Sequence, residues 1–269
     1  HAMGDVHPHA LKALLCRELS RISFGRWMPD GRGMTILSNS GFEAVESALK
    51  TALLATKKPG VIAFEGGYHG LGYGALNATH REHFRGPFGS QLARFGRFLP
   101  FPSQAGQFQA VERSIREMTE PGGIGAILVE PIQARGGIRV PPHGFLAMLR
   151  NVATETGVLL ILDEIYTGFG RTGAWFACEH EGVAPDLICL GKALTGGFPL
   201  SAWVGRADLM TAAWPRSGGE AIHTSTFLGH PVGCAMALAQ IKEVARRDLP
   251  GRSAKLGDWL AEVCRARAA

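Results

Sequence analysis

Residues 158–164 read VLLILDE, and residues 187–192 read LICLGK. In both stretches a continuous apolar run ends abruptly at a charged side chain, Asp163 in the first and Lys192 shortly after the second. Apolar runs of this length without polar alternation are typical of strands that helices cover on both faces. The two stretches therefore predict a mainly parallel sheet in a doubly wound α/β fold, with an acid and a lysine at the ends of two strands.

Similar apolar runs, separated by helical patterns, occur along most of the chain. Strands are expected at Met34–Leu37, Val61–Phe64, Ala126–Val129, Val158–Leu162 and Leu187–Leu190. Helices are expected near Glu43–Ala55, Gly144–Glu155 and Pro231–Arg246. The segment Thr79–Gly106 is rich in Phe, Arg, Gly and Pro and has no clear period, so we expect a long surface excursion there.

Composition excludes several classes of protein. A chain of 269 residues with 46% hydrophobic content can bury a sizeable core in one or two domains. The net charge of +5 arises from scattered residues, so no nucleic-acid partner is expected. The apolar runs are much shorter than the roughly 20 residues of a membrane-spanning helix, so no membrane partner is expected either. The five cysteines lack CxxC spacing, which predicts neither disulfides nor a metal site and favours a cytoplasmic location.

Neither end of the sequence has the features of a domain terminus. The first residues, HAMGDVHPHALK, have no Met at position 1 and no signal-peptide pattern. The last residues, LGDWLAEVCRARAA, form an amphipathic helical pattern without a capping residue after it. We therefore expect the complete protein to continue on both sides, and this chain to be truncated at both ends.

Polar residues directly follow four of the predicted strands. They are Asn39-Ser40-Gly41, Glu130-Pro131-Ile132-Gln133, Asp163-Glu164 and Gly191-Lys192. Each feature is common by itself, because a Gly-Lys pair after a strand is usually solvated and an Asp-Glu or Ser-Gly pair often only caps a helix. Ligands of open α/β sheets bind outside the carboxyl ends of the strands, so the coincidence of all four at one edge favours a binding site.

The chemical groups at this edge match those that pyridoxal phosphate requires. The cofactor needs a lysine for an imine, an acid that keeps its pyridine nitrogen protonated, and an anion site for its phosphate. Lys192 and Asp163 would supply the first two. The unpaired N–H groups of the helix that follows Gly41 would supply the third, because they lie at the positive end of the helix dipole.

Five longer stretches resemble, in the same order, those of class III aminotransferases. They are SNSGFEAVESALK (38–50), FEGGYHGLGYGAL (64–76), LVEPIQARGGIRVPP (128–142), LILDEIYTGFGRTG (160–173) and LICLGKALTGGFPLSAWVG (187–205). The resemblance extends from about His7 to the end of the chain. It implies the large domain of a fold-type I transferase over residues 1–247, with the first ~30 residues as a remnant of the N-terminal segment. Residues 248–269 would begin a small C-terminal domain that is largely absent.

The resemblance implies a role for each matching residue. Lys192 would carry pyridoxal 5'-phosphate as a Schiff base and Asp163 would pair with the pyridine nitrogen, and these two are the predicted catalytic residues. Gln133 would hydrogen-bond the phenolic oxygen of the cofactor. Tyr68 would stack on one face of its ring and Ile165 would pack against the other.

The remaining cofactor-binding residues would surround the phosphate and the ring. The phosphate cradle would consist of Ser40, Gly41 and Phe42. Family members usually have a small hydroxyl residue in place of Phe42, so contact there would use only its backbone N–H. Thr226 would reach the phosphate of the neighbouring subunit, which implies a homodimer. His69, which is not expected to be catalytic, and Glu130 complete the set.

The activity that the resemblance implies is amino transfer between an amine or amino acid and a 2-oxo acid, a reaction of the EC 2.6.1 type. Arg135 replaces a glutamate that is typical of 4-aminobutyrate and ornithine transaminases, which argues against those substrates. Two alternatives remain open. One is an aminomutase, racemase or decarboxylase built on the same lysine and aspartate. The other is a fragment without catalytic activity.

Overall fold

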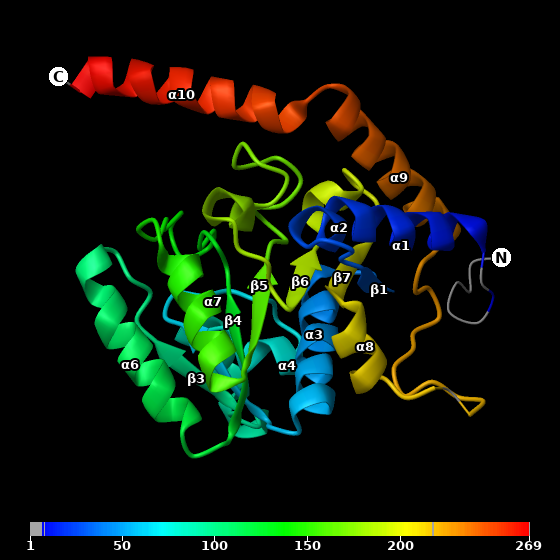
Figure 1. Ribbon diagram of the computed structural model, residues 1–269, viewed down its shortest axis with the longest axis horizontal. Coiled ribbons are helices and arrows are strands. Elements are labelled where there is room, and N and C mark those ends of the chain that lie inside the picture. Colours follow the sequence, from blue (N-terminus) through cyan, green and yellow to red (C-terminus); the bar gives the residue numbers. More distant parts are fainter. Residues whose placement is uncertain (1–6, 8, 217, 269) are drawn as a thin grey trace.

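The computed structural model describes residues 7, 9–216 and 218–268. Within these residues a seven-stranded sheet forms the centre of the molecule, in the order β1-β7-β6-β5-β4-β2-β3 (Figure 1). The strands are β1 (Gly33–Ser38), β2 (Gly60–Phe64), β3 (Gly96–Leu99), β4 (Ile124–Val129), β5 (Leu159–Asp163), β6 (Leu187–Leu190) and β7 (Ser201–Arg206).

The sheet is mainly parallel, as predicted. The pairs β2–β3, β2–β4, β4–β5 and β5–β6 are parallel, whereas β7 is antiparallel to both β6 and β1. Because β7 runs against both of its neighbours, β1 runs in the same direction as β6. The carboxyl ends of β1, β4, β5 and β6 therefore share one edge of the sheet, as the positions of the polar residues suggested.

Helices cover both faces of the sheet. They are α1 (Ala10–Ile22), α2 (Phe24–Trp27), α3 (Gly41–Thr56), α4 (Tyr73–Leu76), α5 (Glu82–Arg85), α6 (Phe108–Thr119), α7 (Phe145–Thr156), α8 (Ala207–Ala213), α9 (Pro231–Arg246) and α10 (Leu249–Ala268). Short 3-10 helices are η1 (Gly86–Gln91), η2 (Ala105–Gln107), η3 (Ala177–Glu181) and η4 (Lys192–Leu194). The predicted helices correspond to α3, α7 and α9.

Two apolar clusters, one on each face, explain why the strands are apolar throughout. In β4, Ile127 and Val129 join the cluster with α1, α6, α7 and α9, whereas Ala126 and Leu128 join the cluster with α3 and α8. Successive side chains of a strand point to opposite faces, so burial of both faces requires every position to be apolar. All six residues of β4 are buried.

Two strands were not expected from the sequence. β3 lies within Thr79–Gly106, so the expectation that this segment is only a surface excursion is wrong in part. β3 is an edge strand with an exposed Arg97, and its four residues carry too weak a pattern to indicate a strand. β7 follows a Gly- and Pro-rich loop, and its residues SAWVGR are small or polar at both ends.

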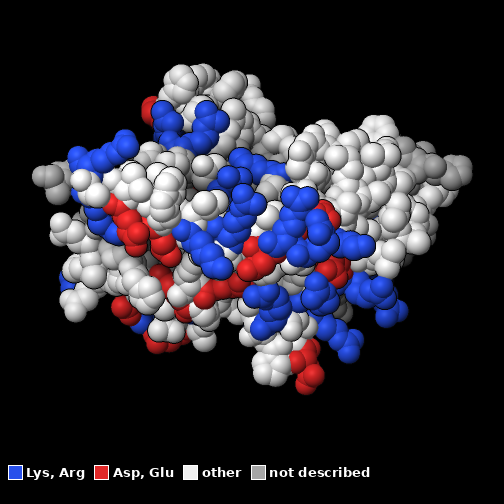
Figure 2. Space-filling model, turned by 90° about the horizontal axis from the view of Figure 1, so that it is seen from above, with Lys and Arg blue, Asp and Glu red and all other residues white. Residues whose placement is uncertain are grey.

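The last helix extends over the rest of the molecule. α10 begins beside the loop after β5, where Ser253 Oγ donates to the backbone oxygen of Arg171 at 3.1 Å, and then runs outward to the C-terminal end in Figure 1. Among the described residues, no helix has both the length and the apolar character needed to cross a membrane. On the face seen in Figure 2, Lys and Arg side chains lie among Asp and Glu side chains.

Candidate active site

A cavity of about 690 Å³ opens at the shared carboxyl edge of the sheet. Of the eleven predicted cofactor-binding residues, eight line this cavity: Gly41, Phe42, Tyr68, His69, Glu130, Asp163, Ile165 and Lys192. The other residues that line it are Gly70, Leu71, Ala134, Arg135 and Tyr166. The fold thus brings most of the predicted set together from segments that are far apart in the sequence.

Lys192 and Asp163 come from neighbouring parallel strands. Asp163 is the last residue of β5, and Lys192 follows Gly191 at the end of β6. The backbone φ of Lys192 is 36°, which is in the left-handed region that residues with a Cβ adopt rarely. Strained backbone of this kind is concentrated at functional sites. The Lys192 side chain is exposed, and its Nζ lies 5.6 Å from the centre of the Tyr166 ring.

The Asp163 carboxylate is buried and held from two sides. Its Oδ2 lies 2.8 Å from Nδ1 of His69, and its Oδ1 accepts a hydrogen bond from the backbone N–H of Ile165 at 3.1 Å. Burial by itself would lower the pKa of His69, but the hydrogen bond to Asp163 and the negative charges of Asp163 and Glu130 raise this pKa above its usual value. These contacts fix the direction of the carboxylate.

Glu130 connects the end of β4 to the loop that carries Tyr68. Its Oε1 accepts from the backbone N–H of Tyr68 at 2.9 Å, and its Oε2 accepts from that of Ala134 at 3.1 Å. Burial raises the pKa of Glu130 to about 7, partly offset by the positive charge of His69. Through its hydrogen bonds to the backbone N–H groups of Tyr68 and Ala134, the Glu130 side chain holds together this part of the cavity wall.

The N-terminal end of α3 faces the cavity through Gly41 and Phe42. Oε2 of Glu43 accepts from the backbone N–H groups of Asn39 and Ser40, each at 2.8 Å, and so fixes the turn from β1 into the helix. A Cβ on Gly41 would lie only 3.0 Å from Cδ1 of Ile165, so glycine allows the helix to approach the end of β5 closely. The first N–H groups of a helix lack intrahelical partners and attract anions.

Three predicted residues do not line the cavity. Ser40 is the N-cap of α3, next to the cavity wall. Gln133 is buried, its Nε2 donates to the backbone oxygen of Glu65 at 2.8 Å, and its Oε1 has no partner among the described residues. Thr226 is exposed, in a turn that precedes α9. The roles of all eleven residues stay predictions.

Five residues of the cavity wall were not predicted to bind the cofactor, and two of them, Tyr166 and Arg135, have polar side chains. Tyr166 stands three positions after Asp163, and Arg135 stands two positions after Gln133. Both occur in the sequence blocks that carry the family resemblance, and this was the signal that could have identified them. Which way a side chain points in a turn after a strand depends on the packing of the turn, which periodicity does not describe.

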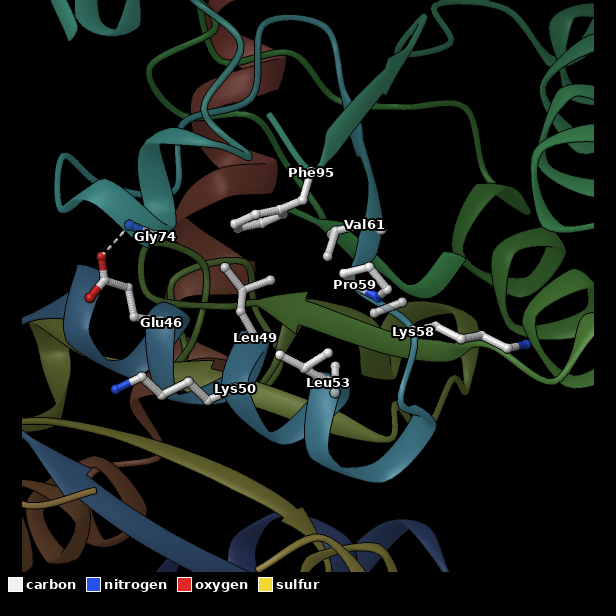
Figure 3. A pocket seen from close by; sticks show the side chains of 12 residues that line it. Glu46, Leu49, Lys50, Leu53, Lys58, Pro59, Val61, Gly74 and Phe95 are labelled. Carbon is white, nitrogen blue, oxygen red and sulfur yellow. Dashed lines mark hydrogen bonds between the residues drawn. The ribbon is translucent and has the colours of Figure 1, made fainter. Parts of the chain in front are cut away.

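Two other hollows among the described residues do not combine a lysine with a buried acid. Figure 3 shows a cavity of about 280 Å³ into which apolar side chains of α3 and β2 and Phe95 project. Its one carboxylate, Glu46, already accepts a hydrogen bond from the backbone N–H of Gly74 at 2.8 Å. A hollow of about 1160 Å³ beside β1 and α8 is lined by basic, apolar and neutral polar side chains, with no carboxylate among the described residues. Of these three hollows among the described residues, the one at the carboxyl edge combines a lysine with a buried acid.

Comparisons with known proteins identify the family of the chain. Residues 1–267 match the family described as "Aminotransferase class-III". The acetylornithine aminotransferase of Methanosarcina mazei is 38% identical over 271 residues, which cover 96% of this chain and 65% of that protein.

Solved structures with a similar fold are also transaminases. An S-selective transaminase from Arthrobacter sp. with alanine bound has a TM-score of 0.86 and 27% identity, over 97% of this chain and 60% of that one. The ornithine aminotransferase of Toxoplasma gondii has a TM-score of 0.84 and 30% identity, over 97% and 59%. The chain thus spans 65% of the length of the curated relative and about 60% of these solved chains. With a family match along nearly all of its length, the chain belongs to the class III aminotransferases, a family that depends on pyridoxal phosphate.

Proposed function

We propose that the complete protein is an aminotransferase that moves an amino group between an amine or amino acid and a 2-oxo acid. The observation that carries this proposal is the position of Lys192 and Asp163 on the wall of one cavity, beside the N-terminal end of α3. An amine, a buried acid and an anion site are therefore adjacent. This combination is what pyridoxal-phosphate chemistry requires.

The residues of the cavity fit the cofactor. Gly41 leaves a cradle at the start of α3 that a Cβ would fill, because that atom would meet Ile165. The exposed amine of Lys192 is accessible to an aldehyde in the cavity. The Asp163 carboxylate is buried and fixed by His69, so it can pair with a protonated ring nitrogen.

The residues that line the cavity have distinct proposed tasks in the reaction. When it is bound, pyridoxal phosphate acts as an electron sink for charge that develops at the substrate carbon. Lys192 would hold the cofactor through Nζ, and its amine when free would move a proton at the substrate carbon. Asp163 would keep the ring nitrogen protonated. Tyr68 and Ile165 would enclose the ring, and the backbone of Gly41 and Phe42 would bind the phosphate.

We also propose a homodimer in which Thr226 binds the phosphate of the second subunit. Thr226 is exposed and does not line the cavity of its own chain, which leaves its hydroxyl accessible to a second copy. Thr226→Val removes the hydroxyl and keeps the shape. We expect this variant to stay dimeric in sedimentation but to bind pyridoxal phosphate more weakly, and unchanged affinity would exclude the role.

The main experiment compares the complete protein with Lys192→Ala and with Lys255→Ala, an exposed lysine of α10. Each protein is incubated with pyridoxal phosphate and reduced with borohydride, and peptide mass spectrometry locates the attached pyridoxyl group. We expect the label on Lys192 in the parent protein and in Lys255→Ala, together with amino transfer to a 2-oxo acid. Label at other lysines only, or equal transfer by Lys192→Ala, would contradict the proposal.

A further inference from the structure

Arg135 lies on the cavity wall in the turn after β4, and aromatic rings hold its side chain. Its guanidinium carbon is 4.7 Å from the centre of the Tyr68 ring and 5.4 Å from that of Phe84. Its backbone oxygen accepts a hydrogen bond from Arg81 at 3.3 Å. Because a guanidinium stacks well on aromatic faces, these rings orient the group without using its N–H donors.

The positive charge of Arg135 is not neutralised by an ion pair within the described residues. The two acids that line the same cavity are occupied elsewhere. Asp163 contacts His69 and the backbone N–H of Ile165, and Glu130 accepts two backbone N–H groups. Arg135 is also exposed, so its donors are accessible from the open side of the cavity.

We propose that Arg135 binds a carboxylate of the substrate and so makes the enzyme selective for amino and oxo acids over amines that lack a carboxylate. A guanidinium offers two parallel N–H donors that match the two oxygens of a carboxylate. Arg135 shares its cavity with Lys192, so one substrate can present its amine to the lysine side and its carboxylate to the arginine. This inference rests on the proposed function, and it identifies the substrate class of that same site.

The test measures binding apart from turnover. The complete protein, saturated with pyridoxal phosphate, is titrated in a calorimeter with glutarate and with glutaramide, which has the same skeleton and no charge. Three variants are compared with the parent: Arg135→Gln, Arg135→Lys and the control Arg85→Gln. Arg85 also stacks on an aromatic ring, at 4.9 Å from the centre of Phe98, but does not line the cavity.

We expect the parent protein to bind glutarate at least about ten-fold more tightly than glutaramide, because loss of a charge-assisted bidentate contact costs more than 1.4 kcal/mol. Arg135→Gln should lose this preference, and its glutaramide affinity should stay unchanged. Arg135→Lys should keep part of the preference for glutarate, because lysine keeps the positive charge. Arg85→Gln should keep the full preference. A preference for glutarate that survives in Arg135→Gln would overturn the inference.

A second measurement separates this inference from the proposed function. The first half-reaction is followed separately with L-glutamate and with L-alanine at saturating concentration, and the glutarate preference is measured in the same proteins. Amino transfer by the parent protein, with a glutarate preference that is lost in Arg135→Gln and kept in Arg85→Gln, supports both proposals. Amino transfer with an intact glutarate preference in Arg135→Gln rejects the inference alone. A glutarate preference that depends on Arg135, in a protein without any amino transfer, rejects the proposed function alone.

Discussion

The imidazole Nδ1 of His69 lies 2.8 Å from Oδ2 of Asp163, and the two residues are only 3% and 5% exposed. The backbone N–H of His69 donates to Oγ1 of Thr79 at 3.0 Å, so the histidine is itself anchored. A buried carboxylate needs partners to remain charged, and here the partner comes from the loop after β2. His69 is therefore a positioning residue for the acid at the end of β5.

His69→Leu should destabilise the protein strongly, because it leaves the buried Asp163 carboxylate without its side-chain partner. Breaking one side of a buried ionic pair costs about 3–5 kcal/mol. His69→Asn is the matched variant, since its Nδ2 can occupy the place of the imidazole Nδ1 and donate to Asp163. Urea denaturation should show a large decrease in the free energy of unfolding for His69→Leu. For His69→Asn the decrease should be less than half as large. Equal losses would mean that ring packing, and not the hydrogen bond, matters at this position.

Stability should fall as the pH rises through the neutral range. The pKa of His69 is raised in the folded state, so its contribution is complete below about 6.5 and is lost as the pH passes the folded pKa. The pKa of Glu130 is raised from 4.5 to about 7, so the folded state binds its proton more tightly, and that stabilisation is lost between these pH values.

Glu130→Gln should remove the second of these two contributions. The free energy of unfolding of the parent protein, relative to that of the variant, should decrease by about 3 kcal/mol between pH 4 and pH 8, since each unit of pKa shift corresponds to about 1.4 kcal/mol. Urea titrations at several pH values measure this difference. Parallel stability profiles of the two proteins would show that Glu130 does not titrate in this range.

The sequence predicted that the residues around Asp163 and Lys192 share one cavity, for a physical reason. Burial on both faces makes each central strand a continuous apolar run, and the end of such a run marks the edge of the sheet. Asp163 and Lys192 each stand at or just after such an end, so their proximity followed once the strands were parallel. The spacing and the resemblance together predicted eight residues that line the cavity.

The features that the sequence did not predict are the cavity residues Tyr166 and Arg135, the contact of Gln133 and the strand β3. Each of them depends on packing. Tyr166 and Arg135 point into the cavity because of how their turns fold, and no periodicity describes a turn. Gln133 stands in a matching block, yet its amide binds Glu65 and does not line the cavity. β3 is short and lies at the sheet edge, where one exposed face permits residues such as Arg97.

Glu164→Gln should lower stability although Glu164 does not line the cavity. Its Oε1 accepts from the backbone N–H of Cys178 at 2.8 Å, and its Oε2 accepts from that of Ala177 at 2.9 Å and from the Thr167 hydroxyl. An amide supplies only one acceptor oxygen, so at least one buried donor loses its partner, at a cost of about 1–3 kcal/mol. Thermal unfolding checks this. The exposed Glu120→Gln is the control, and an equal melting temperature for both variants would contradict the expectation.

Gly70→Ala should damage the phosphate end of the cavity. Gly70 has a φ of 117°, a conformation that strains any residue with a Cβ. The added Cβ would also overlap Cβ of Phe42 and lie 3.0 Å from its Cα, so the first turn of α3 would have to move. Strain and overpacking together should cost about 3 kcal/mol. Gly106→Ala is the control, because its Cβ meets no atom within 4 Å.

The two alanine variants separate local strain from a general effect of losing a glycine. Gly106 has no positive φ, so an alanine there should change the free energy of unfolding by less than about 0.5 kcal/mol. Gly70→Ala should also bind pyridoxal phosphate more weakly, because Gly41 and Phe42 begin the helix whose first turn is proposed to bind the phosphate. Urea denaturation and cofactor titration measure the two effects. If Gly70→Ala lost stability but kept full cofactor affinity, the first turn of α3 would not be part of the phosphate site.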